Sequence, residues 1–214
     1  MQKINFTTSD GVIIVANWFS VKNAKKAALL LHMMPATKES WNDFAVKLNE
    51  AGICALAIDL RGHGESIVQN GKKIDYKNFP DGSHADCVKD VDAALKWLKG
   101  QGIDETIIIG GSIGANLAID VMARRPEIKK GVALSPGLEF LGVPTDDKIS
   151  LLKKDQKIFL VASEDDDYSY NSVLKLKELN PTAKTKLFKS AGHATRMFSA
   201  KPELMDELID WLKK

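Results

Sequence analysis

The sequence predicts an α/β protein with a mostly parallel central sheet and helices on both faces. Short apolar runs bounded by turn residues alternate with segments of helical periodicity along the chain. Most of these runs are continuous in Ile, Val, Leu and Ala, as in strands buried on both faces. The 214 residues are 44% hydrophobic and 27% charged and contain no repeat or linker, so one domain spanning 1–214 is expected.

The apolar runs predict about eight strands. They are expected at residues 3–7, 12–19, 27–31, 53–58, 106–109, 131–134, 158–162 and 186–188. The first two runs are separated only by the turn Ser9-Asp10-Gly11, which leaves no room for a helix. An antiparallel pair at one edge of the sheet is therefore expected.

Five segments between or after these runs show helical patterns. They are expected at residues 40–51, 85–99, 115–123, 172–179 and 202–212. The first has a capping-box start, with Ser40 three residues before Asp43, and Gly52 follows its end. Strands that alternate with helices in this way form parallel sheets covered on both faces.

The charge balance argues against several classes of partner. There are 30 basic and 28 acidic residues, for a net charge of +2, so neither nucleic acid nor an anionic membrane is expected as a partner.

The start of the chain has no secretory apolar region and no stretch is long enough to span a bilayer, so a cytoplasmic protein without membrane insertion is expected. Cys54 and Cys87 are expected as separate thiols, and no Cys/His spacing indicates zinc.

The run Gly110-Gly111-Ser112-Ile113-Gly114 lies between an expected strand and an expected helix. A serine hydroxyl is a weak nucleophile, so it has to be held exposed at a sharp strand-to-helix turn near a base. Glycines at both sides leave space for the close backbone, and the helix N-terminus favours a developing negative charge. Ser112 is the candidate nucleophile; the alternative is a helix N-cap beside packing glycines.

From Ala27 to the C-terminus the sequence resembles the α/β-hydrolase family. A second segment carries this resemblance: the run from Asp59 to Ser66 matches the recurrent pattern Asp-x-Arg-Gly-x-Gly-x-Ser. The family implies the α/β-hydrolase fold for this chain. We interpret Asp59 and Arg61 as structural residues that tie loops together near the site.

The resemblance also implies a base and an acid in the order nucleophile, acid, histidine. His193 is the one histidine after Ser112, so it is the expected base. Family members often place the aspartate three residues after a small residue that closes the preceding strand, and counting from Ser163 gives Asp166. Asp165 is the alternative acid, and a solvated acidic loop is the alternative to both.

Two backbone N–H groups are implied as the oxyanion hole. One belongs to Ile113, the residue after the nucleophile, and alignment of His32 with the family's His-Gly-x-Gly segment makes Met34 the other. Here Met33 and Pro35 stand where the family has glycines, which restricts the backbone and leaves the Met33 N–H as an alternative donor.

Many family members insert a helical cap at a position where this chain has only residues 136–156. No sizeable cap domain is therefore expected, and an open site favours soluble esters with short or medium acyl chains. Apolar residues that flank the catalytic segments are candidates for the acyl pocket or for ordinary packing: Leu138, Phe140, Leu141, Tyr168 and Phe198. The loop 67–82, with its turn Pro80-Asp81-Gly82, is expected near the site.

The function that these residues imply is hydrolysis of a carboxylic ester through an acyl-enzyme, with a small-molecule ester as partner and no cofactor or metal. A thioesterase, an acyltransferase or a perhydrolase would use the same residues. A serine nucleophile argues against enzymes of this fold that use cysteine or aspartate. A non-catalytic binding protein is the alternative from another class. Oligomeric state is not indicated by the sequence.

Overall fold

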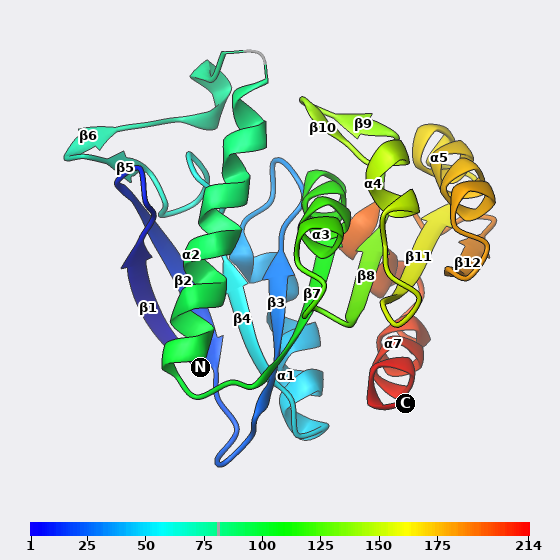
Figure 1. Ribbon diagram of the computed structural model, residues 1–214, viewed down its shortest axis with the longest axis horizontal. Helices are drawn as coiled ribbons and strands as arrows, with labels where there is room; N and C mark the ends of the chain where they lie inside the picture. Colours follow the sequence, from blue (N-terminus) through cyan, green and yellow to red (C-terminus); the bar gives the residue numbers. More distant parts are fainter. Residues whose placement is uncertain (81) are drawn as a thin grey trace.

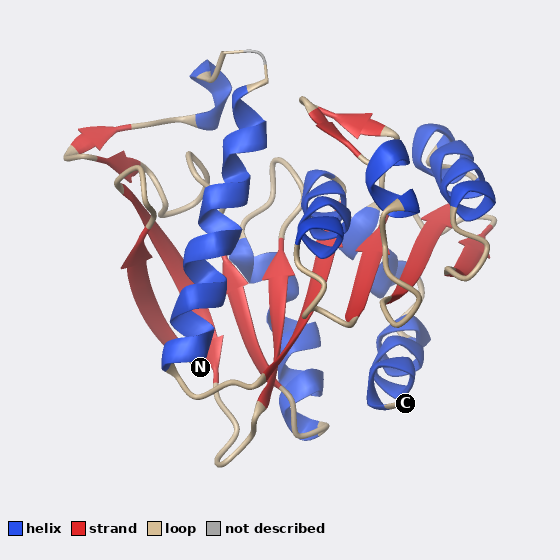
Figure 2. Cartoon of the chain, in the orientation of Figure 1, coloured by secondary structure: helices blue, strands red, loops and turns tan. Residues whose placement is uncertain are grey.

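The computed structural model describes residues 1–80 and 82–214, so Asp81 of the expected turn at 80–82 lies outside the described residues. A twisted sheet forms the middle of the molecule and helices cover both of its faces (Figures 1 and 2). The predicted fold class, a mostly parallel central sheet with helices on both faces, is confirmed, and the described residues include no sizeable cap.

The sheet contains ten strands within the described residues, in the order β12-β11-β8-β7-β3-β4-β2-β5-β6 with β1 beside β2. The strands are β1 Gln2–Thr7, β2 Val12–Phe19, β3 Lys26–Leu31, β4 Cys54–Ile58, β5 Val68–Gln69, β6 Lys72–Lys73, β7 Glu105–Gly111, β8 Lys130–Leu134, β11 Lys157–Ser163 and β12 Lys184–Phe188. The path from β12 to β4 is parallel, whereas β1 and β2 pair antiparallel, as expected.

The helices divide between the two faces of the sheet. They are α1 Asn42–Glu50, α2 Cys87–Gly100, α3 Ile113–Arg124, α4 Asp146–Ser150, α5 Asp167–Leu179, α6 Met197–Ala200 and α7 Glu203–Lys213. Side chains of α2, α3, α4 and α5 pack on one face, and those of α1, α6 and α7 pack on the other. Alternate residues of the buried strands serve the two cores: Leu29 faces one and Leu30 the other. The continuous apolar runs follow from this burial on both faces.

The start of the first helix differs from the prediction. Ser40 does not cap it: its hydroxyl donates to the Thr37 carbonyl oxygen at 2.8 Å, and the 3-10 helix η1, Lys38–Trp41, leads into α1. The cause lies in tertiary structure, because Lys38 is buried against Asp59 and draws this segment inward.

The structure also contains short elements that the sequence patterns do not show. Two-residue strands β5 and β6 form a hairpin, and β9 Glu139–Phe140 pairs with β10 Val143–Pro144 in a second hairpin followed by α4. Strands this short bury too few side chains to leave a period in the sequence. The segment between β8 and β11, where no sizeable cap is expected, is thus a hairpin and a short helix.

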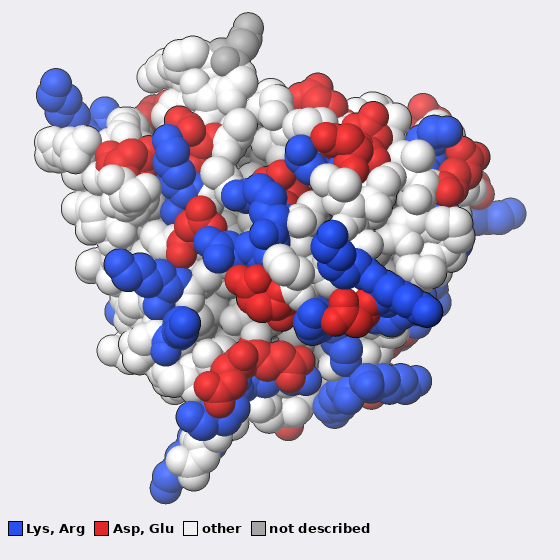
Figure 3. All heavy atoms as spheres, viewed as in Figure 1, with Lys and Arg blue, Asp and Glu red and all other residues white. Residues whose placement is uncertain are grey.

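The surface carries both charge signs side by side (Figure 3). Exposed carboxylates follow β8 and β11, the strands that end beside the expected acid and base: Glu139, Asp146, Asp147, Glu164, Asp165 and Asp167. Among the described residues, no helix combines the length and apolar character needed to cross a bilayer.

Candidate active site

Ser112 occupies the turn between β7 and α3 in a strained backbone conformation. Its φ is 53° and its ψ is −120°, a region that residues other than glycine rarely adopt. The Ser112 N–H donates to the Leu134 carbonyl oxygen at 2.9 Å, which ties the turn to the end of β8. Its side chain is half-buried rather than enclosed in the core. This is the sharp strand-to-helix turn that the glycine-rich run predicts.

The two glycines of the Gly-x-Ser-x-Gly pattern are required by close backbone contacts. A Cβ at Gly110 would lie 1.9 Å from the Gly114 carbonyl oxygen, and a Cβ at Gly114 would lie 2.3 Å from the Leu31 carbonyl oxygen. Both distances are far below van der Waals contact with backbone atoms that have no room to move. The glycines therefore serve the packing of α3 on β7 and β3.

His193 and Asp166 meet although they are 27 residues apart. The His193 Nδ1 atom lies 2.7 Å from Asp166 Oδ2, and the side chains are 29% and 18% exposed. His193 follows β12, and Asp166 precedes the first residue of α5. A carboxylate at Nδ1 favours the tautomer that leaves Nε2 free to accept a proton.

Asp166 is held in its ionised form. Partial burial pushes its pKa upward, but the hydrogen bond and charge interaction with His193, together with the nearby Ser135 and Ser169 hydroxyls, outweigh burial and lower the pKa below its usual value. A carboxylate that stays charged can orient and stabilise an imidazolium.

Asp165, the alternative acid, points to a different partner. Its carboxylate accepts hydrogen bonds from the Ser190 hydroxyl at 3.0 Å and from the Gly192 N–H at 3.2 Å. Together with the Ser163 hydroxyl, these donors lower the pKa of Asp165 to about 2. Asp165 thus holds the loop before His193 and does not bond the imidazole.

Three loops converge at Gly111, the residue before Ser112. A Cβ at Gly111 would lie 3.0 Å from the Ala194 Cβ and 3.8 Å from the Met33 Cβ. The Thr195 hydroxyl lies 3.9 Å from the Met33 sulfur, which joins the second and third loops directly. The turn with Ser112, the loop with His193 and the loop with Met33 and Met34 are therefore neighbours at the carboxyl end of β7.

His32 determines the orientation of the peptide between Met33 and Met34. The Leu60 N–H donates to His32 Nε2 at 3.0 Å, so Nδ1 carries the proton and donates to the Met33 carbonyl oxygen at 2.9 Å. Burial lowers the pKa of His32 to about 4, which keeps the ring neutral. In a trans peptide the N–H points opposite to the C=O, so the Met34 N–H points away from His32.

The second expected donor, Ile113, is the first residue of α3. The first N–H groups of a helix have no acceptor within the helix, and the helix dipole adds positive partial charge there. Ile113 follows β7, and Met34 follows β3. These two strands are neighbours in the sheet and run parallel.

A buried ion pair anchors the loop after β3. Lys38 is 1% exposed, and its Nζ lies 2.7 Å from Asp59 Oδ2, while its own N–H donates to Asp59 Oδ1 at 2.8 Å. Asp59 also accepts the Glu65 N–H at 2.9 Å. Arg61 bonds the buried Asp90 with its guanidinium. These contacts agree with the interpretation of Asp59 and Arg61 as residues that tie loops together.

The apolar residues near the site fall into two groups. Phe198 is 6% exposed and packs against Trp41 and Phe44 on the other face of the sheet, which is ordinary core packing. Phe140 and Tyr168 contact each other with ring centroids 5.4 Å apart. The hairpin that contains Phe140, with Leu138 just before it and the exposed Leu141 at its tip, remains the candidate for substrate contact.

This hairpin is fixed to α3 by Asn116. The fully buried Asn116 side chain donates to the Val143 carbonyl oxygen at 2.8 Å and accepts the Gly137 N–H at 3.0 Å. A Cβ on Gly142 would lie 2.9 Å from the Gly82 Cα, so the tip of the hairpin also meets the end of the loop expected near the site.

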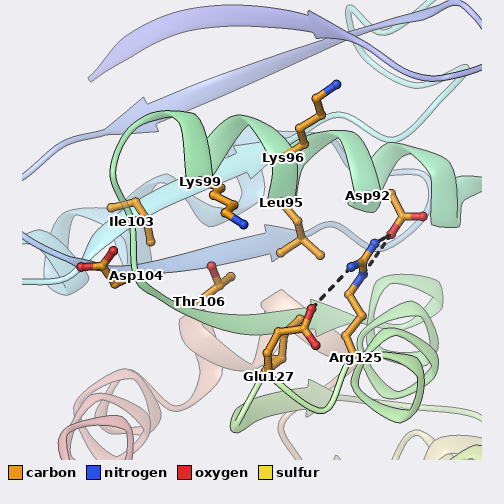
Figure 4. Close-up of a pocket in the computed structure, with 10 residues that line it drawn as sticks. Asp92, Leu95, Lys96, Lys99, Ile103, Asp104, Thr106, Arg125 and Glu127 are labelled. Atoms are coloured by element: carbon orange, nitrogen blue, oxygen red, sulfur yellow. Dashed lines mark hydrogen bonds and ion pairs between the residues drawn. The ribbon is translucent and has the colours of Figure 1, made fainter.

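A surface groove of about 640 Å³ lies elsewhere, between α2 and the turn after α3 (Figure 4). Leu95, Ile103 and Ile128 are among its apolar lining residues, and Arg125 pairs there with Asp92 at 2.7 Å. Thr106, at the start of β7, lines the groove, whereas Ser112 follows the last residue of β7. At the usual rise of a strand, Thr106 and Ser112 are roughly 20 Å apart. The groove is separate from the candidate active site.

Two residues at the site were not predicted. Lys38 has no apolar or motif signal, because a lone lysine in a polar loop usually faces solvent. Ser135, which follows β8 and is fully buried, also has no apolar or motif signal in the sequence. Among the described residues, no group of three or more His, Cys, Asp or Glu side chains is arranged to hold a metal ion.

Solved esterases share this fold. The Pyrococcus furiosus esterase Pf2001 superposes with a TM-score of 0.80 at 21% identity, covering 99% of this chain and 91% of that one. The esterase RhEst1 from a Rhodococcus species gives 0.80 at 16% identity over 100% and 99% of the chains. A Nitrososphaera gargenis structure described among carboxylesterases gives 0.82 at 15% identity over 98% of each chain.

Sequence comparison supplies the family. An uncharacterized protein of Rickettsia prowazekii (strain Madrid E) is 34% identical over 116 residues, which are 51% of this chain and 44% of that protein, so the chain spans less than half of that relative's length. The family model described as serine aminopeptidase S33 (Hydrolase_4) matches residues 22–160. That match includes the Ser112 turn and covers more than half of the 214 residues, and the chain therefore belongs to this family of α/β-hydrolases.

Proposed function

We propose that this hydrolase cleaves carboxylic esters through an acyl-enzyme, with Ser112 as nucleophile, His193 as base and Asp166 as the acid that orients it. One observation carries the proposal. His193 and Asp166 share a hydrogen bond of 2.7 Å, and the loop that carries His193 meets the strained Ser112 turn at Gly111. Strained turns next to a base oriented by a carboxylate are typical of activated serines.

The reaction proceeds in two halves. Ser112 Oγ bonds to the ester carbonyl carbon while its proton passes to His193 Nε2, and the N–H groups of Met34 and Ile113 hold the oxyanion. The imidazolium then gives its proton to the ester's alkoxide oxygen as the C–O bond breaks, and the alcohol leaves the acyl-enzyme. Water attacks the acyl-enzyme, again giving its proton to His193, and the carboxylic acid departs as Ser112 regains its proton.

Soluble esters with short or medium acyl chains are the proposed substrates. The segment between β8 and β11 supplies a hairpin and the five-residue helix α4 instead of a large cap, so little of a long acyl chain would be enclosed. The names of the structural neighbours, esterases and carboxylesterases, support this substrate class.

We further propose that residues 1–214 form one domain that works in a reducing compartment such as the cytoplasm. Cys54 and Cys87 are both buried free thiols, which supports this environment. The proposal includes no cofactor and no nucleic-acid partner.

The first test is covalent labelling with a fluorophosphonate. Wild-type protein is expected to be labelled at Ser112, and Ser112→Ala is expected to lose both the label and ester hydrolysis, because the nucleophile is gone. Ser199→Ala, which removes an exposed serine on α6, is the matched control and should label normally. Folded wild-type protein that takes no label would contradict the proposal.

A second test identifies the bond that is cleaved. We expect p-nitrophenyl acetate and butyrate to be turned over faster than the matching acyl thioesters or an amino-acid anilide. Faster thioester cleavage would favour the thioesterase alternative, and transfer to added alcohol in preference to water would favour an acyltransferase. Preference for the anilide would replace the ester proposal by a peptidase.

A further inference from the structure

The end of β8 contacts the segments of both the nucleophile and the base. Leu134 accepts the Ser112 N–H at 2.9 Å, and the next residue, Ser135, accepts the Ala194 N–H with its Oγ at 3.0 Å. The Ser135 N–H donates to the Val161 carbonyl oxygen at 2.8 Å, which fixes the segment to β11. Two adjacent residues thus bond the Ser112 turn and the loop that follows His193.

Backbone strain gathers at the same place. Ser112, Ser135 and Ala194 have φ values of 53°, 50° and 51°, three of the six non-glycine residues with positive φ among the described residues. Each such residue costs energy that the surrounding contacts must outweigh, and such residues cluster at functional sites. Ser135 is strained together with the nucleophile and the residue after the base.

The Ser135 hydroxyl still has a proton to donate. It uses an acceptor position for the Ala194 N–H, and Ser135 is 0% exposed, so its own proton needs a buried acceptor. The Asp166 carboxylate is the candidate acceptor, because the Ser135 hydroxyl is among the groups that, with His193, lower its pKa against the effect of burial. The neighbouring Ser169 hydroxyl also lies 3.4 Å from the Ser135 carbonyl oxygen.

We propose that Ser135 is a positioning residue of this active site: its hydroxyl accepts the Ala194 N–H and donates to Asp166, so that one buried group sets the base loop relative to the acid. The inference rests on the proposed function, because it assigns the support of the same site. Ser135 touches neither substrate nor reacting atoms and acts through His193 and Asp166.

Loss of this hydroxyl has two consequences. The Ala194 N–H loses its acceptor, which loosens the loop that carries His193, and Asp166 loses one donor, which changes the carboxylate that faces the imidazole. Both changes affect proton transfer to and from Ser112 rather than substrate binding.

The test compares Ser135→Gly with Ser135→Ala. Glycine adopts positive φ freely and relieves the strain, whereas alanine keeps it, and both lack the hydroxyl. A misplaced base costs about 10- to 100-fold in kcat, so we expect that loss in both variants with KM within about twofold of wild type. Asn23→Gly is the matched control, because it relieves a φ of 61° between β2 and β3, at the opposite end of β3 from the site.

A second measurement does not depend on ester hydrolysis. NMR titration of the His193 ring is expected to shift in both Ser135 variants, although the charged groups near it, Asp165, Asp166 and Arg196, are unchanged. If Ser135→Gly keeps the wild-type kcat and His193 titration, the proposal is overturned while the esterase proposal stands. If wild-type protein hydrolyses no ester, the titration still decides: a shift supports the link between Ser135 and His193, and an unchanged curve overturns it.

Discussion

Adjacent aspartates at the end of β11 have different partners because of how the chain turns there. Asp166 lies at the N-terminus of α5 and bonds the His193 ring, whereas Asp165 faces the backbone of residues 190–192. Under the proposed function, one carboxylate orients the base and the other holds the loop that carries it. Their roles are therefore separable by substitution.

We expect Asp166→Asn to lower kcat about 10³- to 10⁴-fold, because an amide can hold the wrong imidazole tautomer. Asp165→Asn should lower kcat by about tenfold or less, since its amide oxygen still accepts a loop N–H, although with less strength. Steady-state kinetics with p-nitrophenyl acetate, alongside melting temperatures, checks the order. The opposite order would make Asp165 the acid.

Among the elements, the loop between β3 and α1 depends most on a single side chain. Its backbone carries the Met34 N–H, and it is fastened at its far end by Lys38 inserted between Asp59 and Glu65. Removing one partner of a buried pair leaves the other charge without compensation.

Lys38→Met is therefore expected to lower the free energy of unfolding by about 3–5 kcal/mol, because Asp59 is 0% exposed and loses its ion-pair partner. Lys47→Met breaks an exposed pair with Asp206 and should cost no more than about 1 kcal/mol. Urea unfolding of the two variants measures the difference. Equal losses would show that the Lys38 pair contributes no more than a surface pair.

For the molecule as a whole, buried histidines are one source of acid sensitivity, and the buried Asp90 carboxyl, whose pKa burial raises to about 6, acts in the opposite direction over the same pH window. Burial lowers the pKa values of His32 and His63 from 6.5 to about 4. The unfolded chain therefore binds these protons at higher pH than the folded protein does. The stability that these two histidines contribute is complete above about pH 6.5 and is lost as the pH decreases toward 4, since their protons favour the unfolded state in that window.

Each such histidine contributes a slope of up to about 1.4 kcal/mol per pH unit. His63→Phe preserves an aromatic ring next to Tyr76, on which His63 stacks at 3.8 Å, and removes one titrating group. We expect a shallower fall of unfolding free energy between pH 6.5 and 4 in this variant, measured by urea titration at several pH values. An unchanged slope would exclude His63 as a source of the acid sensitivity.

Sequence patterns predict an element correctly where burial requires a regular run of apolar residues or where close contacts require glycine. The eight main strands lie within two residues of their predicted ends, because burial on both faces demands continuous apolar runs. The Ser112 turn was recognisable because its glycines are needed by contacts of 1.9 and 2.3 Å. The capping box at Ser40 was wrong, because burial of Lys38 by a residue 21 positions away overrides a local signal.

The sequence alone determined the α/β class, the order of strands and helices and, through the family resemblance, candidate residues for nucleophile, base, acid and oxyanion donors. The tertiary structure decided which aspartate faces His193, how His32 sets the Met33–Met34 peptide, and that the Ser135 hydroxyl accepts the N–H of the residue after His193. These features depend on hydrogen bonds between loops from different strands. Such bonds leave no local period in the sequence. Each partner is a common polar residue, and its role depends on which other loops lie next to it at the edge of the sheet.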